Sequence, residues 1–173
     1  EVYYQLSRKC IVTEYHQRTS QAMDIPVLSD IVDEYEMNDK NHEDDADCMI
    51  HVRLGDVIDN DSRSVSDFVR GINEEQGEYQ GYVKPIRYYT AVVKQLPVHV
   101  KRIVLVSGSH VPTLHPEKSQ DYLQHLKNAM QTMGYVVSIR WNKSPDDDLV
   151  TLCRAKYVGV SGGGVSQRVA AVA

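Results

Sequence analysis

Three short polar segments of this 173-residue chain combine residue types that suit the binding of a phosphate group. His51 and Arg53 alternate with apolar residues, so both side chains project from one face of a predicted strand. Ser107 follows a second apolar run, and the segment from Ser161 to Ser166 contains three successive glycines. An arginine fork can make two parallel hydrogen bonds to a phosphate, and glycines let the backbone approach a ligand closely. These residue types indicate anion binding.

The glycine-rich segment joins a predicted strand to a predicted C-terminal helix, Gln167 to Ala173. The first turn of a helix presents free N–H groups and a partial positive charge, which together attract an anion. Ser161 and Ser166 can add hydroxyl donors, and Gly163 is the central one of the three glycines. The segment is not a P-loop, because no Gly-Lys-Ser/Thr sequence follows it. The alternative is a tight turn that binds nothing.

His51 and Arg53 also allow a purely structural interpretation. A histidine and an arginine near a strand end are costly to bury without a hydrogen-bonding or anionic partner. Either a phosphate ligand or the protein itself can provide that partner. In the structural alternative, His51 is hydrogen-bonded in the core and Arg53 forms an ion pair with Asp56 or Asp59. The sequence leaves both interpretations open.

The other polar residues show no metal or nucleophile pattern. No other histidine has metal-ligand spacing, and the acidic run from Asp146 to Asp148 follows Ser144 and Pro145 in the arrangement typical of a helix start. Three widely spaced cysteines form neither a disulfide framework nor a zinc motif. A net charge of −5 argues against non-specific nucleic-acid binding, and no apolar run approaches the roughly 20 residues of a membrane span. We therefore expect no metal, no nucleic acid and no membrane-spanning helix.

Apolar runs and helical spacing predict an alternating series of strands and helices. The predicted strands are Cys48 to Leu54, Ile103 to Val106, Tyr135 to Ile139 and Tyr157 to Val160. The predicted helices cover residues 25–35, 85–96, 116–133, 144–153 and 167–173. This alternation indicates an α/β fold with a mostly parallel sheet and helices on both faces. Ligands of such sheets bind beyond the carboxyl ends of the strands, so we expect the three polar segments to meet at one edge.

We expect two regions along the chain. Residues 1–47 form a helical and acidic amino-terminal segment, and residues 48–173 form the α/β domain that carries the three polar segments. Within that domain, the polar stretch from Val57 to Lys84 is expected to be a long loop with one helical turn around Phe68. The first residues show neither an initiator methionine nor a signal pattern, so we expect a piece of a longer protein.

The segment from His51 to Asp56 resembles the HxRxGD motif of the superfamily of α1,2-, α1,6- and protein O-fucosyltransferases. Two further segments are similar to motifs of that superfamily and follow in the same order. Pro85 to Tyr89 is similar to its helix with two adjacent tyrosines. Asp148 to Tyr157, together with the glycine-rich turn, is similar to its last motif. The resemblance extends roughly from Cys48 to Ala173.

This resemblance implies the donor-binding half of a two-domain glycosyltransferase. Members of the superfamily have two facing Rossmann-like domains, and the carboxyl-terminal one binds GDP-fucose without a metal ion or another cofactor. They transfer fucose with inversion to a glycan or glycoprotein acceptor, and in complex cells they usually work in the Golgi lumen. We accordingly expect a Rossmann-like nucleotide-sugar-binding domain, with residues 1–47 as a remnant or linker of an acceptor-side region.

The resemblance also implies roles for individual residues. Arg53 is expected to bind the β-phosphate and to act as the catalytic residue, with His51 beside it. The segment from Ser107 to His110 is expected to lie along the nucleoside. The donor-binding residues implied besides Arg53 and His51 are Ser107, Ser161, Gly163, Gly164, Val165 and Ser166. Cationic groups and backbone N–H groups placed in this way would neutralise the charge that develops on the leaving GDP.

Two positions depart from the pattern of the superfamily. Leu54 stands where many members have a second arginine, and Ser109 and His110 stand where many have an acidic residue that helps to recognise guanine. These departures keep two other hypotheses open. One is a non-catalytic nucleotide-sugar-binding module. The other is a different α/β enzyme with a phosphate-containing ligand, such as a phosphatase or a nicotinamide-dependent enzyme.

Overall fold

The structure is a computed structural model that describes residues 25–38, 46–72, 82–109 and 112–172. Within these ranges four strands form one sheet in the order β3-β2-β1-β4, and every neighbouring pair is parallel. The strands are β1 (Cys48–His51), β2 (Arg102–Ser107), β3 (Val136–Trp141) and β4 (Val158–Gly159). The predicted parallel sheet is confirmed.

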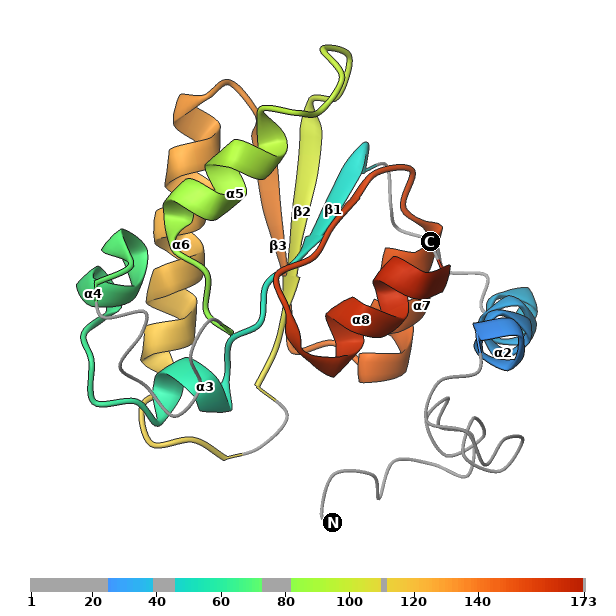
Figure 1. The fold of residues 1–173 in the computed structure, drawn as a ribbon, viewed down its shortest axis with the longest axis horizontal. Coiled ribbons are helices and arrows are strands. Elements are labelled where there is room, and N and C mark those ends of the chain that lie inside the picture. Colours follow the sequence, from blue (N-terminus) through green and yellow to red (C-terminus); the bar gives the residue numbers. More distant parts are fainter. Residues whose placement is uncertain (1–24, 39–45, 73–81, 110–111, 173) are drawn as a thin grey trace.

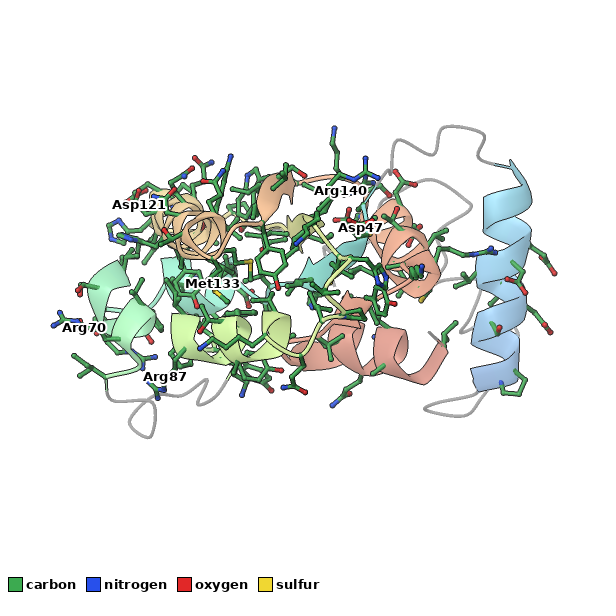
Figure 2. All side chains as sticks on the ribbon, turned by 90° about the horizontal axis from the view of Figure 1, so that it is seen from above. Asp47, Arg70, Arg87, Asp121, Met133 and Arg140 are labelled. Carbon is green, nitrogen blue, oxygen red and sulfur yellow. The ribbon has the colours of Figure 1, made fainter. Side chains whose placement is uncertain are left out.

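Helices cover both faces of this sheet. They are α2 (Ile25–Asn38), α3 (Asp56–Asp59), α4 (Val65–Arg70), α5 (Ile86–Val93), α6 (Glu117–Thr132), α7 (Pro145–Arg154) and α8 (Gly163–Val172). Helices α5 and α6 lie on one face, and α7 and α8 lie on the other (Figure 1). Helix α2 forms an outer layer beside α7 and α8 and is the blue helix at one end of Figure 2. The arrangement is that of a Rossmann-like α/β fold, as predicted.

The strands bury apolar side chains on both faces, which explains their continuous apolar runs. On one face Ile50 belongs to a cluster with Tyr89 of α5. On the other face Met49 belongs to a cluster with Val169 of α8, and α2 adds Ile31 to the same cluster. Each fully buried side chain of this kind stabilises the fold by about 1.5–3 kcal/mol. The sheet is therefore held rigidly between two apolar layers.

The order of the strands reverses at β1. From β1 the chain proceeds to β2 and β3 on one side, and it then crosses back through α7 to place β4 on the other side of β1. The connections that follow β1 and β4 leave the sheet toward opposite faces, and open α/β sheets bind ligands in the crevice between two such connections. In Figure 1 the strands run downward, and α3 and the start of α8 lie at their lower ends. The topology thus brings the first and last polar segments together.

Most helices begin where the sequence predicts. Pro85 and Pro116 directly precede α5 and α6. Ser144 precedes α7, and its Oγ accepts a hydrogen bond from the N–H of Asp147 at 3.5 Å. The sequence predicts these helix starts because proline and a capping hydroxyl act within one turn of the chain.

Several boundaries differ from the prediction. Helix α8, predicted to begin at Gln167, begins at Gly163, so the helix starts within the glycine-rich segment that was predicted as a turn. Strand β1 ends at His51 rather than Leu54, although the N–H of Val52 still donates to the carbonyl of Val106 at 2.9 Å. The stretch predicted as a loop with one helical turn contains both α3 and α4. Reciprocal hydrogen bonds between Ser64 and Asp67 begin α4, a local capping device that can form a helix without much apolar surface. Residues 73–81 of this stretch lie outside the described ranges. No helix in the described ranges is long and apolar enough to cross a membrane.

Candidate functional site

Arg53 and the glycine-rich turn lie against each other at the carboxyl edge of the sheet. A Cβ atom built on Gly163 would be 3.4 Å from Arg53 Cδ and 3.6 Å from Arg53 Nε. The Arg53 side chain therefore lies within van der Waals contact of the position that a Cβ atom at residue 163 would take. Gly162 and Gly163 have φ angles of 138° and 79°, which side-chain-bearing residues rarely adopt. The predicted meeting of the first and last polar segments is confirmed.

His51 joins the end of β1 to the first turns of α8. It is 9 % exposed, and its Nδ1 lies 2.7 Å from Ser166 Oγ, 115 residues further along the chain. Ser166 Oγ also accepts a hydrogen bond from the N–H of Gly162 at 3.0 Å. The histidine is hydrogen-bonded within the protein, in agreement with the structural interpretation of the sequence. Together His51 and Ser166 fix the glycine-rich turn to the sheet.

The hydroxyls of Ser161 and Ser107 also bond to the protein. Ser161 Oγ accepts a hydrogen bond from the N–H of Arg53 at 2.8 Å, and Ser107 Oγ donates to the carbonyl of Val52 at 2.7 Å. Both serines are 3 % exposed. These contacts connect the segment after β1 to the end of β2 and to the segment after β4. The two serines therefore hold the parts of the candidate site together. His110, at the end of the predicted nucleoside segment, lies outside the described residues.

The Arg53 guanidinium is held beside the turn by two contacts with described residues. Its Nη2 forms an ion pair with Asp56 Oδ1 at 2.7 Å, and its Nη1 donates to the carbonyl of Leu54 at 2.8 Å. Of the two acids considered from the sequence, Asp56 is the partner, whereas Asp59 bonds elsewhere. The Arg53 side chain is 31 % exposed. Since a guanidinium has five N–H donors, it retains donors for an additional anion.

The first turn of α8 supplies uncharged donors next to this guanidinium. The N–H groups of Gly163, Gly164 and Val165 have no acceptor within the helix, and they carry its partial positive charge. The first turn of α8 contains no acid, whereas the first turn of α7 contains three aspartates. An anion beside Arg53 would thus face both a guanidinium and an uncompensated helix end.

The buried Asp59 side chain stabilises the turn at Gly55 through hydrogen bonds with Ser119. The Asp59 carboxylate is fully buried and accepts hydrogen bonds from the Ser119 hydroxyl at 2.7 Å, the Ser119 N–H at 3.0 Å and the Thr113 hydroxyl at 3.0 Å. Ser119 Oγ in turn accepts from the N–H of Gly55 at 3.0 Å. Gly55 has a φ of 69°, and a Cβ there would lie 3.0 Å from the carbonyl oxygen of Gly108. The turn after Arg53 is therefore closely packed against the segment after β2.

A second charged pair lies on the α7 face of the same sheet edge. His51, Val106 and Arg140 are register neighbours on β1, β2 and β3. Arg140 Nε donates to Asp148 Oδ1 at 2.6 Å. Burial raises the pKa of Asp148, and Arg140 offsets this effect only in part. Because the folded state then binds this proton more readily than the unfolded state, ionisation of Asp148 above its ordinary pKa of 3.8 lowers the stability.

The acidic residues at the start of α7 favour the start of the helix and also take part in tertiary contacts. The helix begins at Pro145 as predicted, but Asp146 and Asp148 are buried, and Asp148 pairs with Arg140. This pair was not predictable from the sequence, because the Ser-Pro start of the helix is a sufficient local explanation for the acids. Within the described residues no group of three acidic, histidine or cysteine side chains could hold a metal ion.

Two adjacent tyrosines of α5 reach the strand and turn that carry the site. The Tyr88 hydroxyl donates to the carbonyl of Val160 at 2.6 Å. The Tyr89 hydroxyl is buried and makes no hydrogen bond with a described residue. Burial raises the pKa of Tyr89, and the neighbouring Ser161 hydroxyl opposes this shift. Tyr88 therefore holds the residue after β4 through a hydrogen bond, whereas Tyr89 packs in the core cluster that contains Ile50.

We expect Tyr89→Phe to raise the free energy of unfolding by about 1 kcal/mol, because it removes a buried hydroxyl that lacks a partner. The matched variant Tyr88→Phe removes a made hydrogen bond and should lower it by about 1 kcal/mol. Urea unfolding of the two variants measures both effects. Equal destabilisation by both variants would show that the Tyr89 hydroxyl is bonded to Ser161 and would contradict the expectation.

No protein-family model matches the chain, and no curated protein or solved structure is significantly similar to it. The function must therefore be inferred from the geometry of the site.

Proposed function

We propose that this chain is the donor-binding domain of a fucosyltransferase-like glycosyltransferase. In this proposal it binds a nucleotide-diphosphate sugar, GDP-fucose, and transfers the sugar with inversion to a glycan or protein acceptor. The observation that carries this proposal is the contact of Arg53 with Gly163 at the start of α8, next to β1, where the order of the strands reverses. The order of motifs that resembles the fucosyltransferase superfamily supports the choice of substrate.

The chemistry follows from the charge of the leaving group. When the bond between sugar and β-phosphate breaks, negative charge develops on the diphosphate. Arg53 and the N–H groups of Gly164 and Val165 would be donors already oriented toward that charge, and the positive end of α8 would add to their effect. Arg53 is therefore the proposed catalytic residue, and His51, Ser161 and Ser166 hold the turn in position.

A thermal-shift screen tests this proposal. The probes are GDP, GDP-fucose, other nucleoside diphosphates, NAD and a phosphomonoester, each in the presence of a chelator. A ligand at 100 times its Kd should stabilise the folded chain by about 2.7 kcal/mol. We expect the largest shift with GDP or GDP-fucose. A preference for NAD or the phosphomonoester would favour another phosphate-binding enzyme, and no shift with any phosphate compound would contradict an anion site.

The ion pair between Arg53 and Asp56 favours a second candidate, a nucleotide-sugar-binding module without transferase activity. Asp56 already neutralises part of the Arg53 charge, which reduces the electrostatic stabilisation available to a leaving diphosphate. Measurement of fucose release from GDP-fucose separates the two candidates. Binding with release or transfer supports the enzyme, and binding without either supports the module.

A further inference from the structure

A second arginine, Arg168, lies against the glycine-rich turn. A Cβ atom built on Gly164 would be 3.1 Å from Arg168 Nη1. Helix side chains lean toward the N-terminus, so the Arg168 guanidinium reaches back to the first turn of α8. Arg53 covers Gly163, the preceding residue, and consecutive Cα atoms are only about 3.8 Å apart. Two guanidinium groups therefore meet the turn at neighbouring positions, one from the segment after β1 and one from α8.

The charge of Arg168 is not balanced within the described part of the chain. Arg53 has Asp56 as a partner, whereas Arg168 has neither a hydrogen bond nor an ion pair with a described residue. The first turn of α8 also contains no acid. A cation near the N-terminus of a helix is repelled by the positive end of the helix dipole. Arg168 thus occupies a place that is unfavourable for it unless an anion is present.

We propose that Arg168 is a second anion-binding arginine that contacts one phosphate of a diphosphate while Arg53 contacts the other. This proposal rests on the proposed function and deepens it, because it makes the site selective for diphosphates over monophosphates. Arg53 and the helix N–H groups are sufficient to bind a single phosphate. A second phosphate placed toward Gly164 meets Arg168 and removes its repulsion by the helix end.

Isothermal titration calorimetry with pyrophosphate and inorganic phosphate tests this inference. We expect Arg168→Ala to weaken pyrophosphate binding about tenfold, which corresponds to about 1.4 kcal/mol, and to leave phosphate binding within about twofold. GDP is the third probe and should lose the same factor as pyrophosphate if the ligand is a nucleoside diphosphate. Arg168→Lys keeps the charge but not the fork, so an intermediate loss is expected.

Two control variants separate the effect from changes in net charge and in helix α8. Arg70→Ala removes a positive charge from α4, far from α8 in Figure 2, and Gln167→Ala changes the exposed neighbour of Arg168. Both should bind the probes as the unchanged chain does. A thermal midpoint within a few degrees of the unchanged chain should accompany Arg168→Ala, because the side chain has no described partner to lose.

The possible outcomes distinguish this inference from the proposed function. If the chain binds pyrophosphate and Arg168→Ala binds it equally well, the inference is wrong and the anion site stands. If Arg168→Ala weakens phosphate and pyrophosphate by the same factor, the selectivity for diphosphates is wrong. If the unchanged chain binds none of the probes, the proposed function fails and the inference fails with it.

Discussion

Asp59→Ala is expected to lower the free energy of unfolding by about 3–4 kcal/mol, the largest stability loss that we predict for a polar residue of this chain. Asp59 is fully buried, and its carboxylate accepts three hydrogen bonds from Ser119 and Thr113. Alanine would leave these donors without an acceptor in a place that water does not reach. Each buried donor left in this way costs about 1–3 kcal/mol.

Chemical and thermal unfolding measure this effect. A loss of this size should lower the thermal midpoint by roughly 6–16 °C for a domain of this length. Asp121→Ala is the matched control, because Asp121 is an exposed acid of α6 that points away from the sheet in Figure 2. The control should stay within about 0.5 kcal/mol of the unchanged chain. If Asp59→Ala were as mild as Asp121→Ala, the buried network around Ser119 would not exist as described.

The topology of the site was predictable from the sequence because it depends on local signals. Apolar runs mark the strands, and proline, serine and glycine mark the ends of the helices. Once strands and helices alternate, the parallel arrangement follows, and the segments after β1, β2 and β4 must share one edge. The meeting of Arg53 with Gly163 is therefore a consequence of the order of elements rather than of any particular contact.

The side-chain partners were not predictable, because they depend on which residues the fold brings together from distant segments. His51 and Ser166 are 115 residues apart, and Asp59 and Ser119 are 60 residues apart. Nothing in the local sequence around Asp59 indicates burial, since it lies in a polar stretch. Arg168 belongs to no sequence motif, and only its proximity to Gly164 identifies it as a candidate site residue. Pairs of this kind depend on strand register and helix rotation, which spacing along the chain does not determine.

Arg53→Ala is expected to weaken the binding of GDP or pyrophosphate roughly 10- to 150-fold, the effect of removing about 1.5–3 kcal/mol of charged hydrogen bonding. The guanidinium lies over Gly163 and keeps donors beyond those used by Asp56 and Leu54. Its ion pair with Asp56 is about one-third exposed, so its loss should change the stability by no more than about 1 kcal/mol. Calorimetry and urea unfolding of the same variant measure the two effects separately.

Arg63→Ala is the matched control for this variant. Arg63 is also paired with an aspartate close to it in sequence, with its Nη2 2.7 Å from Asp61 Oδ2, and its guanidinium lies 4.3 Å from the centre of the Phe68 ring. It belongs to the connection between α3 and α4, and Asp61 and Phe68 lie in the same part of the chain. We expect Arg63→Ala to lower stability and to leave ligand affinity unchanged, which is the opposite of Arg53→Ala.

The competition between Asp56 and a ligand gives the Arg53 prediction a second measurable consequence. A carboxylate and a phosphate accept hydrogen bonds from the same guanidinium, so a bound anion must share Arg53 with Asp56 or displace it. Salt screens the attraction between a partly exposed guanidinium and an anion, so the affinity of the unchanged chain should fall as ionic strength rises. In Arg53→Ala this fall should be shallower, because one of the charges is gone. If Arg53→Ala retained both the affinity and its salt dependence, the anion would bind elsewhere, and the catalytic role proposed for Arg53 would be wrong.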